Sequence, residues 1–414
     1  MRMKSLYLLL VPALLFGDSL KDLLEFAKYN NNLLTSSKIS IDAKKNELES
    51  VKSSYYPTID AGLFYERDDK PNSFLAQTTY GATAKIAFDI YDGNNKYYKE
   101  KQKYSELKAV KSSYDNDFKY LSLVITKDFF NLKTLYASLE AQEESLKTLK
   151  AQLKRVEQFY NAKLATIDDV DKLKSEYSKY LYIIQTLRFK ILSLKKSLEL
   201  KVGKNIDTMD SSKFNKSFIE DNSELDAITA IKEDKKSLES LAETIDSYYY
   251  PNIRIEDSYT IFSYQGKPEY AGNKLPMLNN QNKLMLTLGI RLFDFGTLNE
   301  QKKALILKAE ALNEQILYKS KEQQMQLALS KERIKTANLN IKSSLKALKF
   351  AKSVLKTITN KYNAGIVDNI TYLDALSSYS KAKSLYEKSL NDLEIAYAIY
   401  YFYNAKALEN FLKG

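Results

Sequence analysis

Two segments that cannot be helical constrain the fold of this chain more than any other feature. The first follows Tyr55-Tyr56-Pro57, where apolar side chains at every second residue predict strands at 57–66 and 79–91, joined by a polar turn. This period of two is typical of strands that have one apolar and one polar face. Each run has about the ten residues that a tilted strand needs to cross a bilayer. A soluble sheet can alternate in the same way, so the pattern alone predicts two-faced strands and leaves their surroundings open.

The second segment repeats the first one, after Pro251. It predicts strands at 252–262 and 283–293, and Asp257 interrupts the apolar series of the earlier strand. Four strands are too few to close a barrel, and in hydrocarbon every unpaired backbone group at an open edge is costly. If these strands lie in a membrane, they therefore need partner chains. The residues predicted to face the lipid are the alternating aliphatic side chains of the last strand: Leu284, Leu286, Leu288, Ile290 and Leu292.

Equal spacings indicate that the whole chain is duplicated. Tyr160 and Tyr362 are 202 residues apart, and so are Val170 and Tyr372. Self-similarity at one offset is typical of a repeated structural unit. Each repeat is predicted to contain a helix, two strands and a helical hairpin, and a C-terminal segment ends the second repeat. The predicted boundaries are 18–203 for the first repeat, 204–223 for an inter-repeat linker or equatorial region, 224–414 for the second repeat, and 95–202 and 298–403 for the two hairpins.

Most of the chain is predicted to be long helix, because its 414 residues include only 11 glycines and 6 prolines. One helix is expected from Leu20 to Ser53, before the first strand. Along 170–198, apolar residues recur at steps of three and four, which is the spacing of a coiled-coil seam. The long helices should therefore pack side by side as antiparallel pairs.

The chain has no cysteine and no histidine. Their absence removes thiol nucleophiles, thiolate and imidazole metal ligands, and the usual general base near neutral pH. We therefore expect no enzyme activity, no metal site and no cofactor. The net charge of +11 arises from lysines that alternate with glutamates along the helices, a pattern of solvated helix faces rather than of nucleic-acid binding.

The N-terminus has the layout of a secretory signal peptide. Arg2 and Lys4 precede an apolar run from Leu6 to Phe16, which is too short to span a bilayer as a helix. We predict a signal peptide at 1–17, with cleavage after Ser19 as the alternative; a buried N-terminal helix is the other interpretation of this run. No other stretch approaches the roughly 20 apolar residues of a membrane-spanning helix, so membrane residence would have to come from strands.

The residues at the two predicted helix–helix turns resemble those of the TolC family of outer-membrane efflux and channel proteins. The second turn is similar to that family's Y-x-x-G and V/L-L-D-A motifs, and the first is a degraded copy with lysine in place of the usual glycine. The resemblance covers essentially the whole mature sequence. The turn residues are Tyr160, Asn161, Ala162, Lys163 and Leu164, with Asp169 after them, and Tyr362, Asn363, Ala364, Gly365 and Ile366, with Asp374 after them.

The resemblance implies a mainly α fold with membrane β: long antiparallel coiled-coil helices and four strands in each protomer. A homotrimer would form one twelve-stranded β-barrel in the lipid of the bacterial outer membrane and an α-helical tunnel in the periplasm. The implied function is the exit duct of a tripartite efflux or type I secretion system. In such a system the turn residues would contact a periplasmic adaptor (membrane fusion) protein, which couples the duct to an inner-membrane transporter. Asp374 and Asp169 would form rings of carboxylates at the tunnel entrance.

Alternatives stay open at this point. The helices alone would suffice for a structural protein that tethers the envelope without channel activity, although four alternating strands would then be superfluous. An adaptor would need a lipoyl-like β-rich domain between its helices, and none is seen. Each of the two aspartates could instead cap a helix or face solvent. The exported substrate, whether drug, metal ion or polypeptide, is not encoded in any motif.

Overall fold

The computed structural model describes residues 19–69, 75–219, 223–270 and 272–413. The predicted signal peptide at 1–17 lies outside these ranges. None of the helices within them combines the length and the hydropathy that a membrane-spanning helix requires.

Long helices alternate with pairs of long strands, as the duplication predicts. The two longest helices, α3 (Asn95–Asn161) and α6 (Thr297–Asn363), have 67 residues each and start 202 residues apart. The prediction of a mainly helical fold with a small β part is confirmed. The remaining helices are α1 (Leu20–Asn30), α2 (Asn32–Ser53), α4 (Ile167–Val202), α5 (Asp226–Asp246) and α7 (Asn369–Tyr403), with short helices η1 (Ser247–Tyr249) and η2 (Leu408–Phe411). The long strands are β1 (Thr58–Arg67), β2 (Thr78–Asp92), β4 (Asn252–Gln265) and β7 (Asn280–Gly289), and the short ones are β3 (Lys213–Phe214), β5 (Glu269–Tyr270), β6 (Asn273–Lys274) and β8 (Leu412–Lys413).

The chain folds into two compact units, and each unit takes residues from both repeats. The hairpin unit holds both helix–helix turns, and the sheet unit holds the four long strands. The two predicted repeats are therefore units of sequence and not compact bodies. The hairpin unit comprises residues 1–37, 114–226 and 320–414, and the sheet unit comprises 38–113 and 227–319.

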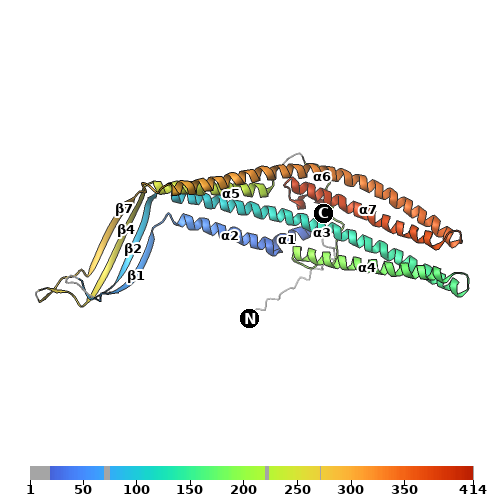
Figure 1. Cartoon of the computed structure of the whole chain (residues 1–414), viewed down its shortest axis with the longest axis horizontal. Coiled ribbons are helices and arrows are strands. Elements are labelled where there is room, and N and C mark those ends of the chain that lie inside the picture. Colours follow the sequence, from blue (N-terminus) through green and yellow to red (C-terminus); the bar gives the residue numbers. More distant parts are fainter. Residues whose placement is uncertain (1–18, 70–74, 220–222, 271, 414) are drawn as a thin grey trace, which may run out of the picture. The chain divides into compact units, whose positions relative to one another are not determined.

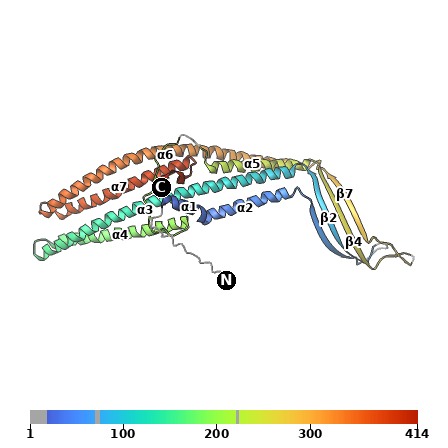
Figure 2. The ribbon, with the colours of Figure 1, turned by 180° about the vertical axis from the view of Figure 1, so that it is seen from behind.

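In the hairpin unit, α4 returns along α3, and α7 returns along α6 (Figure 2). The larger core of this unit contains a dense aromatic group on the last turns of α7, where Tyr400 and Tyr401 are fully buried. The Tyr401 ring stacks on Phe411 with 4.1 Å between ring centroids. The C-terminal segment is thereby packed against the last helix.

Residues of the predicted inter-repeat linker or equatorial region, 204–223, contribute to this core. Ile206 and Phe214 are each only 1% exposed. The amide of Phe214 donates to Oε2 of the buried Glu394 at 2.8 Å, and Lys216 forms an ion pair with the same carboxylate at 3.1 Å. Met209 and Ile219 of the same stretch also pack against this core, and together these apolar side chains supply enough burial to fix the segment.

The helix expected from Leu20 to Ser53 is broken at Asn31, which has extended backbone angles. Its Oδ1 accepts hydrogen bonds from the amides of Leu33 at 2.9 Å and Leu34 at 3.1 Å. Its Nδ2 donates to the carbonyl of Lys201, near the C-terminus of α4, at 2.7 Å. Asn31 thus caps α2 and satisfies a helix-end carbonyl of a distant segment.

In the sheet unit, the four long strands form one antiparallel sheet in the order β1-β2-β4-β7 (Figure 1). The predicted strand 283–293 begins earlier and ends at Gly289, so Ile290 and Leu292 are not strand residues. The last pair of the β4–β7 ladder is Asn252 with Gly289. The ladder stops there because the next residue of the partner strand is Pro251, which has no amide hydrogen.

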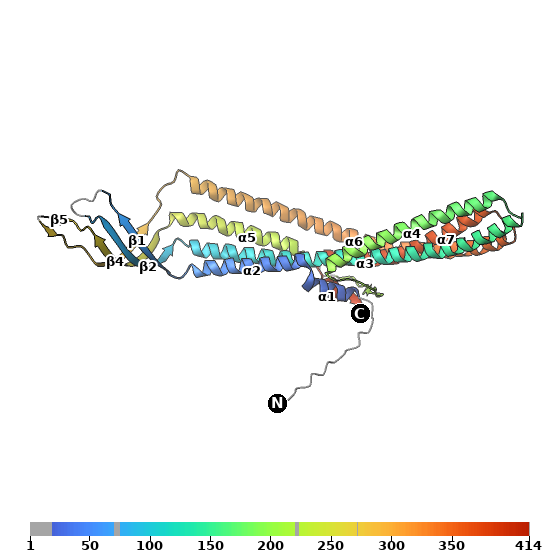
Figure 3. The ribbon, with the colours of Figure 1, turned by 90° about the horizontal axis from the view of Figure 1, so that it is seen from below.

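Helices α2 and α3 run side by side in the sheet unit (Figure 3), joined by a network of four charged side chains. Lys44 lies 2.9 Å from Glu106, and Lys103 lies 2.9 Å from Glu47. Each lysine also pairs with the carboxylate on its own helix at 3.0 Å. Because the charges alternate in sign around the network, it fixes which residues of the two helices face one another.

We expect Glu394→Ala to lower the free energy of unfolding by about 2–3 kcal/mol, because the buried amide of Phe214 would lose a charged acceptor. Glu394→Gln retains a carbonyl acceptor and should cost less than half as much. Thermal unfolding in detergent and limited proteolysis within 204–219 measure the effect. A Glu394→Ala variant as stable and as protease-resistant as the parent would contradict the role given to this contact.

Candidate functional site

The sheet of the sheet unit has one apolar and one polar face. The strand register aligns the apolar side chains of all four strands on the same face. On β7 this face carries Leu284, Leu286 and Leu288, each 66–68% exposed. So large an exposed apolar area is typical of a membrane or protein contact surface. The members on the other strands are Ile59, Ala61, Leu63, Tyr65, Tyr80, Ala82, Ala84, Ile86, Phe88, Ile253, Ile255, Tyr259 and Ile261.

One acidic residue interrupts the apolar face. Asp257 pairs with Ile86 on one side and with Leu284 on the other. Its Oδ1 is buried and has no hydrogen-bond partner among the described residues. Nothing in the structure explains this carboxylate.

The opposite face of the sheet carries charges in cross-strand pairs. Lys85 Nζ lies 3.2 Å from the Glu256 carboxylate, and Arg254 Nη1 lies 3.3 Å from that of Asp89. Opposite charges placed side by side favour this register and keep the face polar. One face of the sheet therefore suits an apolar environment, and the other suits water.

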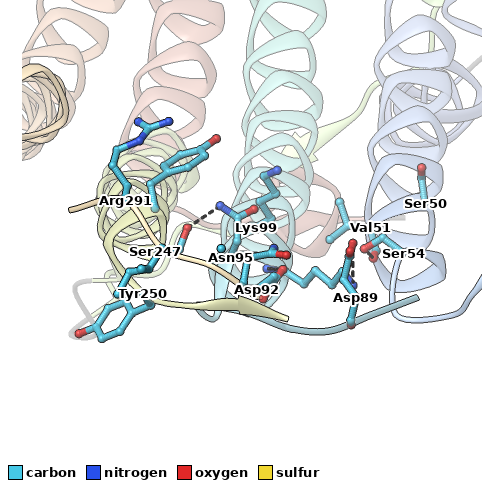
Figure 4. Close-up of a pocket in the computed structure, with 15 residues that line it drawn as sticks. Ser50, Val51, Ser54, Asp89, Asp92, Asn95, Lys99, Ser247, Tyr250 and Arg291 are labelled. Carbon is cyan, nitrogen blue, oxygen red and sulfur yellow. Dashed lines mark hydrogen bonds and ion pairs between the residues drawn. The ribbon is translucent and has the colours of Figure 1, made fainter. Parts of the chain in front are cut away.

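A cavity of about 780 Å³ lies where the strands meet the helices of the sheet unit (Figure 4). Asn95, at the start of α3, donates from Nδ2 to Ser247 Oγ at 2.7 Å and so joins α3 to η1. Asp89 is paired with Lys96 Nζ at 3.7 Å. Ile290, predicted to face lipid, is among the residues that line this cavity. The cavity walls are held by contacts that fix the strand-to-helix junction.

Two equivalent turns carry the chain from a strand into a long helix. In the first, Asp92 Oδ2 accepts a hydrogen bond from the amide of Lys96 at 2.9 Å. In the second, Asp294 Oδ2 accepts from the amide of Leu298 at 2.9 Å, and this bond lowers the pKa of the Asp294 carboxyl. Both aspartates satisfy amides of the first helical turn. Each turn contains two residues with left-handed backbone: Gly93 and Asn94, and Phe295 and Gly296.

The two helix–helix turns of the hairpin unit close in the same way. In the first turn, the amide of Leu164 donates to the carbonyl of Phe159 at 2.8 Å, and the amide of Lys163 donates to that of Tyr160 at 2.9 Å. These two bonds form a Schellman closure of α3. The second turn repeats them from Ile366 to Lys361 at 2.9 Å and from Gly365 to Tyr362 at 3.1 Å.

This closure requires a left-handed residue at equivalent positions of the two turns. Gly365 has φ of 71°, and Lys163 has φ of 60°. Glycine adopts this region without strain, whereas a side chain such as that of lysine disfavours it. Apart from Gly365 itself and its two neighbours in the chain, no atom of the described residues lies within 4 Å of the position that a Cβ there would take. A substitution there would therefore meet backbone strain and no steric clash.

The two carboxylates predicted at a tunnel entrance have different surroundings. Asp169 belongs to the capping box of α4, where it accepts from Thr166 Oγ1 at 2.8 Å and from the Thr166 amide at 3.3 Å. Asp374, in the second turn of α7, is exposed and makes no hydrogen bond or ion pair with any residue that the structure describes. Only Asp374 is thus free to interact with a solute or an ion.

Sequence reasoning passed over Asp368, which is the N-cap of α7. Its Oδ1 accepts from the amide of Thr371 at 2.8 Å. Hydrogen bonds from the Thr371 side chain and amide lower the pKa of the Asp368 carboxyl. The signal was present, because an aspartate directly before a helical pattern is a preferred N-cap.

Contacts between the two turns join the hairpins. Arg155 Nη1 donates to Asn363 Oδ1 at 2.5 Å, and Asn369 Nδ2 donates to the carbonyl of Asp169 at 3.3 Å. A cavity of about 570 Å³ lies between the turns. The predicted turn residues that the structure brings to its wall are Leu164, Asp169, Tyr362, Asn363, Ala364 and Gly365.

Beneath this cavity, Tyr372 packs in the small core that holds the turns together. Its ring stacks on Tyr362 with 4.9 Å between centroids and 15° between planes. Tyr372 is 0% exposed, and its hydroxyl has no hydrogen-bond partner among the described residues. Burial raises the pKa of Tyr372 to about 12.

Each turn exposes one aliphatic side chain at the equivalent position. Leu164 is 76% exposed and Ile366 is 70% exposed. Two aliphatic side chains held outward on rigid turns form a surface suited to contact with another protein.

We expect Lys163→Gly to stabilise the first turn by about 0.5–1 kcal/mol, because glycine removes the left-handed strain. Gly365→Ala should destabilise the second turn by a similar amount. Hydrogen exchange of the closing amides, Leu164 in the first variant and Ile366 in the second, measures local opening. Faster exchange of Leu164 in Lys163→Gly would contradict the expectation.

The raised pKa of Tyr372 predicts a loss of stability at alkaline pH. Its neutral form stabilises the fold fully below pH 10.0, and this contribution is lost as pH rises from 10.0 to about 12. Two pKa units correspond to roughly 2–3 kcal/mol. Tyr372→Phe should be at least as stable as the parent at pH 7, since the hydroxyl is unpaired, and should lose less stability above pH 10. Thermal midpoints against pH test this, with exposed Tyr160→Phe as control; parallel curves for Tyr372→Phe and parent would refute it.

The chain was compared with known protein families, curated proteins and solved structures. Residues 23–178 match the sequence pattern of the family described as "Outer membrane efflux protein". No curated protein sequence matches the chain significantly.

Similar solved structures share the fold over nearly the full length. The match to the outer membrane protein VceC of Vibrio cholerae has 14% identity, covers 94% of this chain and 96% of VceC, and has a TM-score of 0.79. The match to the CmeC outer membrane channel of Campylobacter jejuni has 12% identity, covers 95% and 86%, and has a TM-score of 0.83. The match to the MtrE outer membrane channel of Neisseria gonorrhoeae has 13% identity, covers 94% of this chain and 89% of MtrE, and has a TM-score of 0.77. Over residues 23–178 the chain is therefore similar to the outer membrane efflux protein family, and over nearly its full length it shares the fold of these solved outer membrane channels.

Proposed function

We propose that three copies of this chain form a channel across the outer membrane that serves as the exit duct of an efflux or secretion system. The observation that carries the proposal is the apolar face of the sheet, which is in register across four strands, is interrupted by Asp257 and is backed by a polar face. Strands of a membrane channel need this arrangement, apolar toward lipid and polar toward water. The chain itself supplies no chemistry in this role, and the energy for export would come from a pump.

The edges of the sheet support assembly with further copies. Strand β1 pairs only with β2, and β7 pairs only with β4, among the described residues. In hydrocarbon the free edges would leave a row of amides and carbonyls unpaired. Pairing of β1 from one copy with β7 from the next satisfies both edges, and the family resemblance supplies the number three.

Exposed apolar stripes on the helices of the hairpin unit also favour contacts between copies. On α4 they are seven, three and eight residues apart, and on α6 they are ten, eleven and four residues apart; each spacing is close to a whole number of helical turns. Such stripes on a helix surface are normally covered by another helix. The residues are Tyr182, Phe189, Leu192 and Leu200 on α4, and Leu329, Leu339, Phe350 and Val354 on α6.

The helix–helix turns are the proposed contact with a periplasmic adaptor, which would connect the duct to an inner-membrane transporter. Leu164 and Ile366 offer two outward aliphatic side chains for that contact. The turns are held rigidly by their closing hydrogen bonds, so the contact surface exists before the partner binds. A structural tether would require the helices only and leaves the two-faced strands without a purpose.

The purified chain should form trimers and conduct ions in planar bilayers. Leu286→Arg should prevent trimer assembly, because a charge on the lipid face costs ~2–4 kcal/mol near the bilayer midplane. Met285→Arg is the matched control, since Met285 lies on the polar face opposite Glu256 and its arginine gains a partner. Native mass spectrometry and single-channel recording measure the two properties. Equal assembly of both variants, or a monomeric parent without conductance, would refute the proposal.

Asp374 is the proposed charged group of the tunnel entrance, because three exposed copies near one axis would attract cations. Asp374→Ala should reduce cation selectivity and weaken block by a trivalent cation added from the side of the turns. The effect should shrink at high salt as the charges are screened. Asp169→Ala should change selectivity less, because Asp169 is held in a helix cap. Wild-type selectivity and block in the Asp374→Ala channel at low ionic strength would contradict the assignment.

A further inference from the structure

The polar face of the sheet is not uniformly polar. At the end near the strand-to-strand loops, one row across the sheet consists of Phe64 on β1, Gly81 on β2 and Phe262 on β4. The next row toward the helices holds Thr83 and Thr260, whose hydroxyls are 3.1 Å apart, and charged rows follow. Aromatic side chains on this face are thus confined to the loop end.

The two phenylalanine rings close over the glycine between them. Their centroids are 5.9 Å apart at an interplanar angle of 68°, an edge-to-face contact. A Cβ on Gly81 would lie 2.0 Å from the carbonyl oxygen of Ile261 and 2.8 Å from the Phe64 ring. Gly81 therefore lets the rings of β1 and β4 meet across β2.

Tyr264 extends this aromatic surface by one row. Its ring stacks on Phe262 with 6.1 Å between centroids and 11° between planes. Its hydroxyl donates to the carbonyl of Leu278 at 2.8 Å, which fixes the ring against the loop before β7. The three rings are each half-buried, so part of every ring is open to the solvent on this face.

The same surface has features that suit a cation. The ammonium of Lys267 lies 5.7 Å from the centroid of the Tyr264 ring, so this ring already faces a cation of the chain and the rings of Phe64 and Phe262 are left to a solute. The exposed carboxylate of Glu66 lies on the same face, in the row of Tyr264 and Thr79. Aromatic ring faces beside a carboxylate match a solute that carries positive charge on an apolar body.

We propose that Phe64, Phe262 and Tyr264 form a contact site for lipophilic cations at the loop end of the channel wall. The inference rests on the proposed function, because it requires that the polar face line the channel. With three copies, the aromatic surface would recur three times around the pore. An exported solute would pass these three aromatic surfaces last, at the loop end of the channel wall.

The test uses the full-length chain in planar bilayers, with tetraphenylphosphonium as the aromatic probe cation and tetraethylammonium as the cation without rings. The parent channel should be blocked by tetraphenylphosphonium at a concentration well below that needed for tetraethylammonium. Phe262→Ser and Phe64→Ser should each weaken the tetraphenylphosphonium block by about five- to tenfold, the size expected from losing one ring contact of ~1 kcal/mol. Block by tetraethylammonium should stay within about twofold on the same grounds.

Two further variants sharpen the result. Phe262→Leu keeps an apolar side chain but removes the aromatic ring. Weaker block of this variant by tetraphenylphosphonium would assign the effect to the ring. Unchanged block would overturn the aromatic site. Ile261 is the neighbour of Phe262 in the chain and lies on the opposite face of the sheet. Tetraphenylphosphonium should therefore block the Ile261→Ser channel as strongly as it blocks the parent channel. Channels that conduct normally but show unchanged tetraphenylphosphonium block in both serine variants would refute the contact site and leave the channel function standing. A parent chain that forms no channel would instead refute the proposed function itself.

Discussion

Backbone hydrogen bonding at the two free edges of the four-stranded sheet is the constraint on which the rest of the structure depends. Within one chain, β1 and β7 each have a strand on one side only. The proposed function sets the exposed apolar face against lipid, where unpaired amides and carbonyls cannot turn to water. Assembly with further copies is then a condition for the folded sheet to exist in a membrane. Edge pairing also explains why one chain carries only four long strands among its described residues.

Because the chain is duplicated, its two halves form their helix starts and helix–helix turns with equivalent hydrogen bonds. Asp92 and Asp294 cap the two longest helices just after a strand, each followed by two left-handed residues. The two helix–helix turns close through identical hydrogen bonds. They differ where the copies have diverged: Gly365 fits its left-handed position, whereas Lys163 occupies the same position under strain.

Sequence reasoning reached the strands, the long helices and the turns because each has a local pattern: alternation, a 202-residue offset and a glycine after a helix. It failed where the outcome depends on a distant segment. The end of β7 is fixed by Pro251 on the neighbouring strand, and the helix break at Asn31 is completed by a carbonyl of α4. The sequence also gives no sign that Phe214, in the linker or equatorial region, contacts Glu394, which is 180 residues away in the chain.

Only part of the candidate site could be predicted from the sequence, because some of its contacts join distant segments. Thr166 and Asp169 have the spacing of a capping box, a local signal for the role that the structure gives to Asp169. The aromatic row has a weaker signal, since Phe64 and Phe262 stand among polar residues of alternating strands. Only the strand register brings those two rings together across Gly81.

The central claim, that one face of the sheet meets lipid and the other water, is tested most directly by a cysteine scan of β7. The chain has no cysteine, so each single substitution gives one thiol. In trimers reconstituted in vesicles, a charged, water-soluble thiol reagent should modify alternate positions, and a quencher attached to lipid chains should affect a fluorophore at the remaining ones. The account predicts modification at 283, 285 and 287 and lipid quenching at 284, 286 and 288. Uniform modification along the strand, or the reverse alternation, would contradict it.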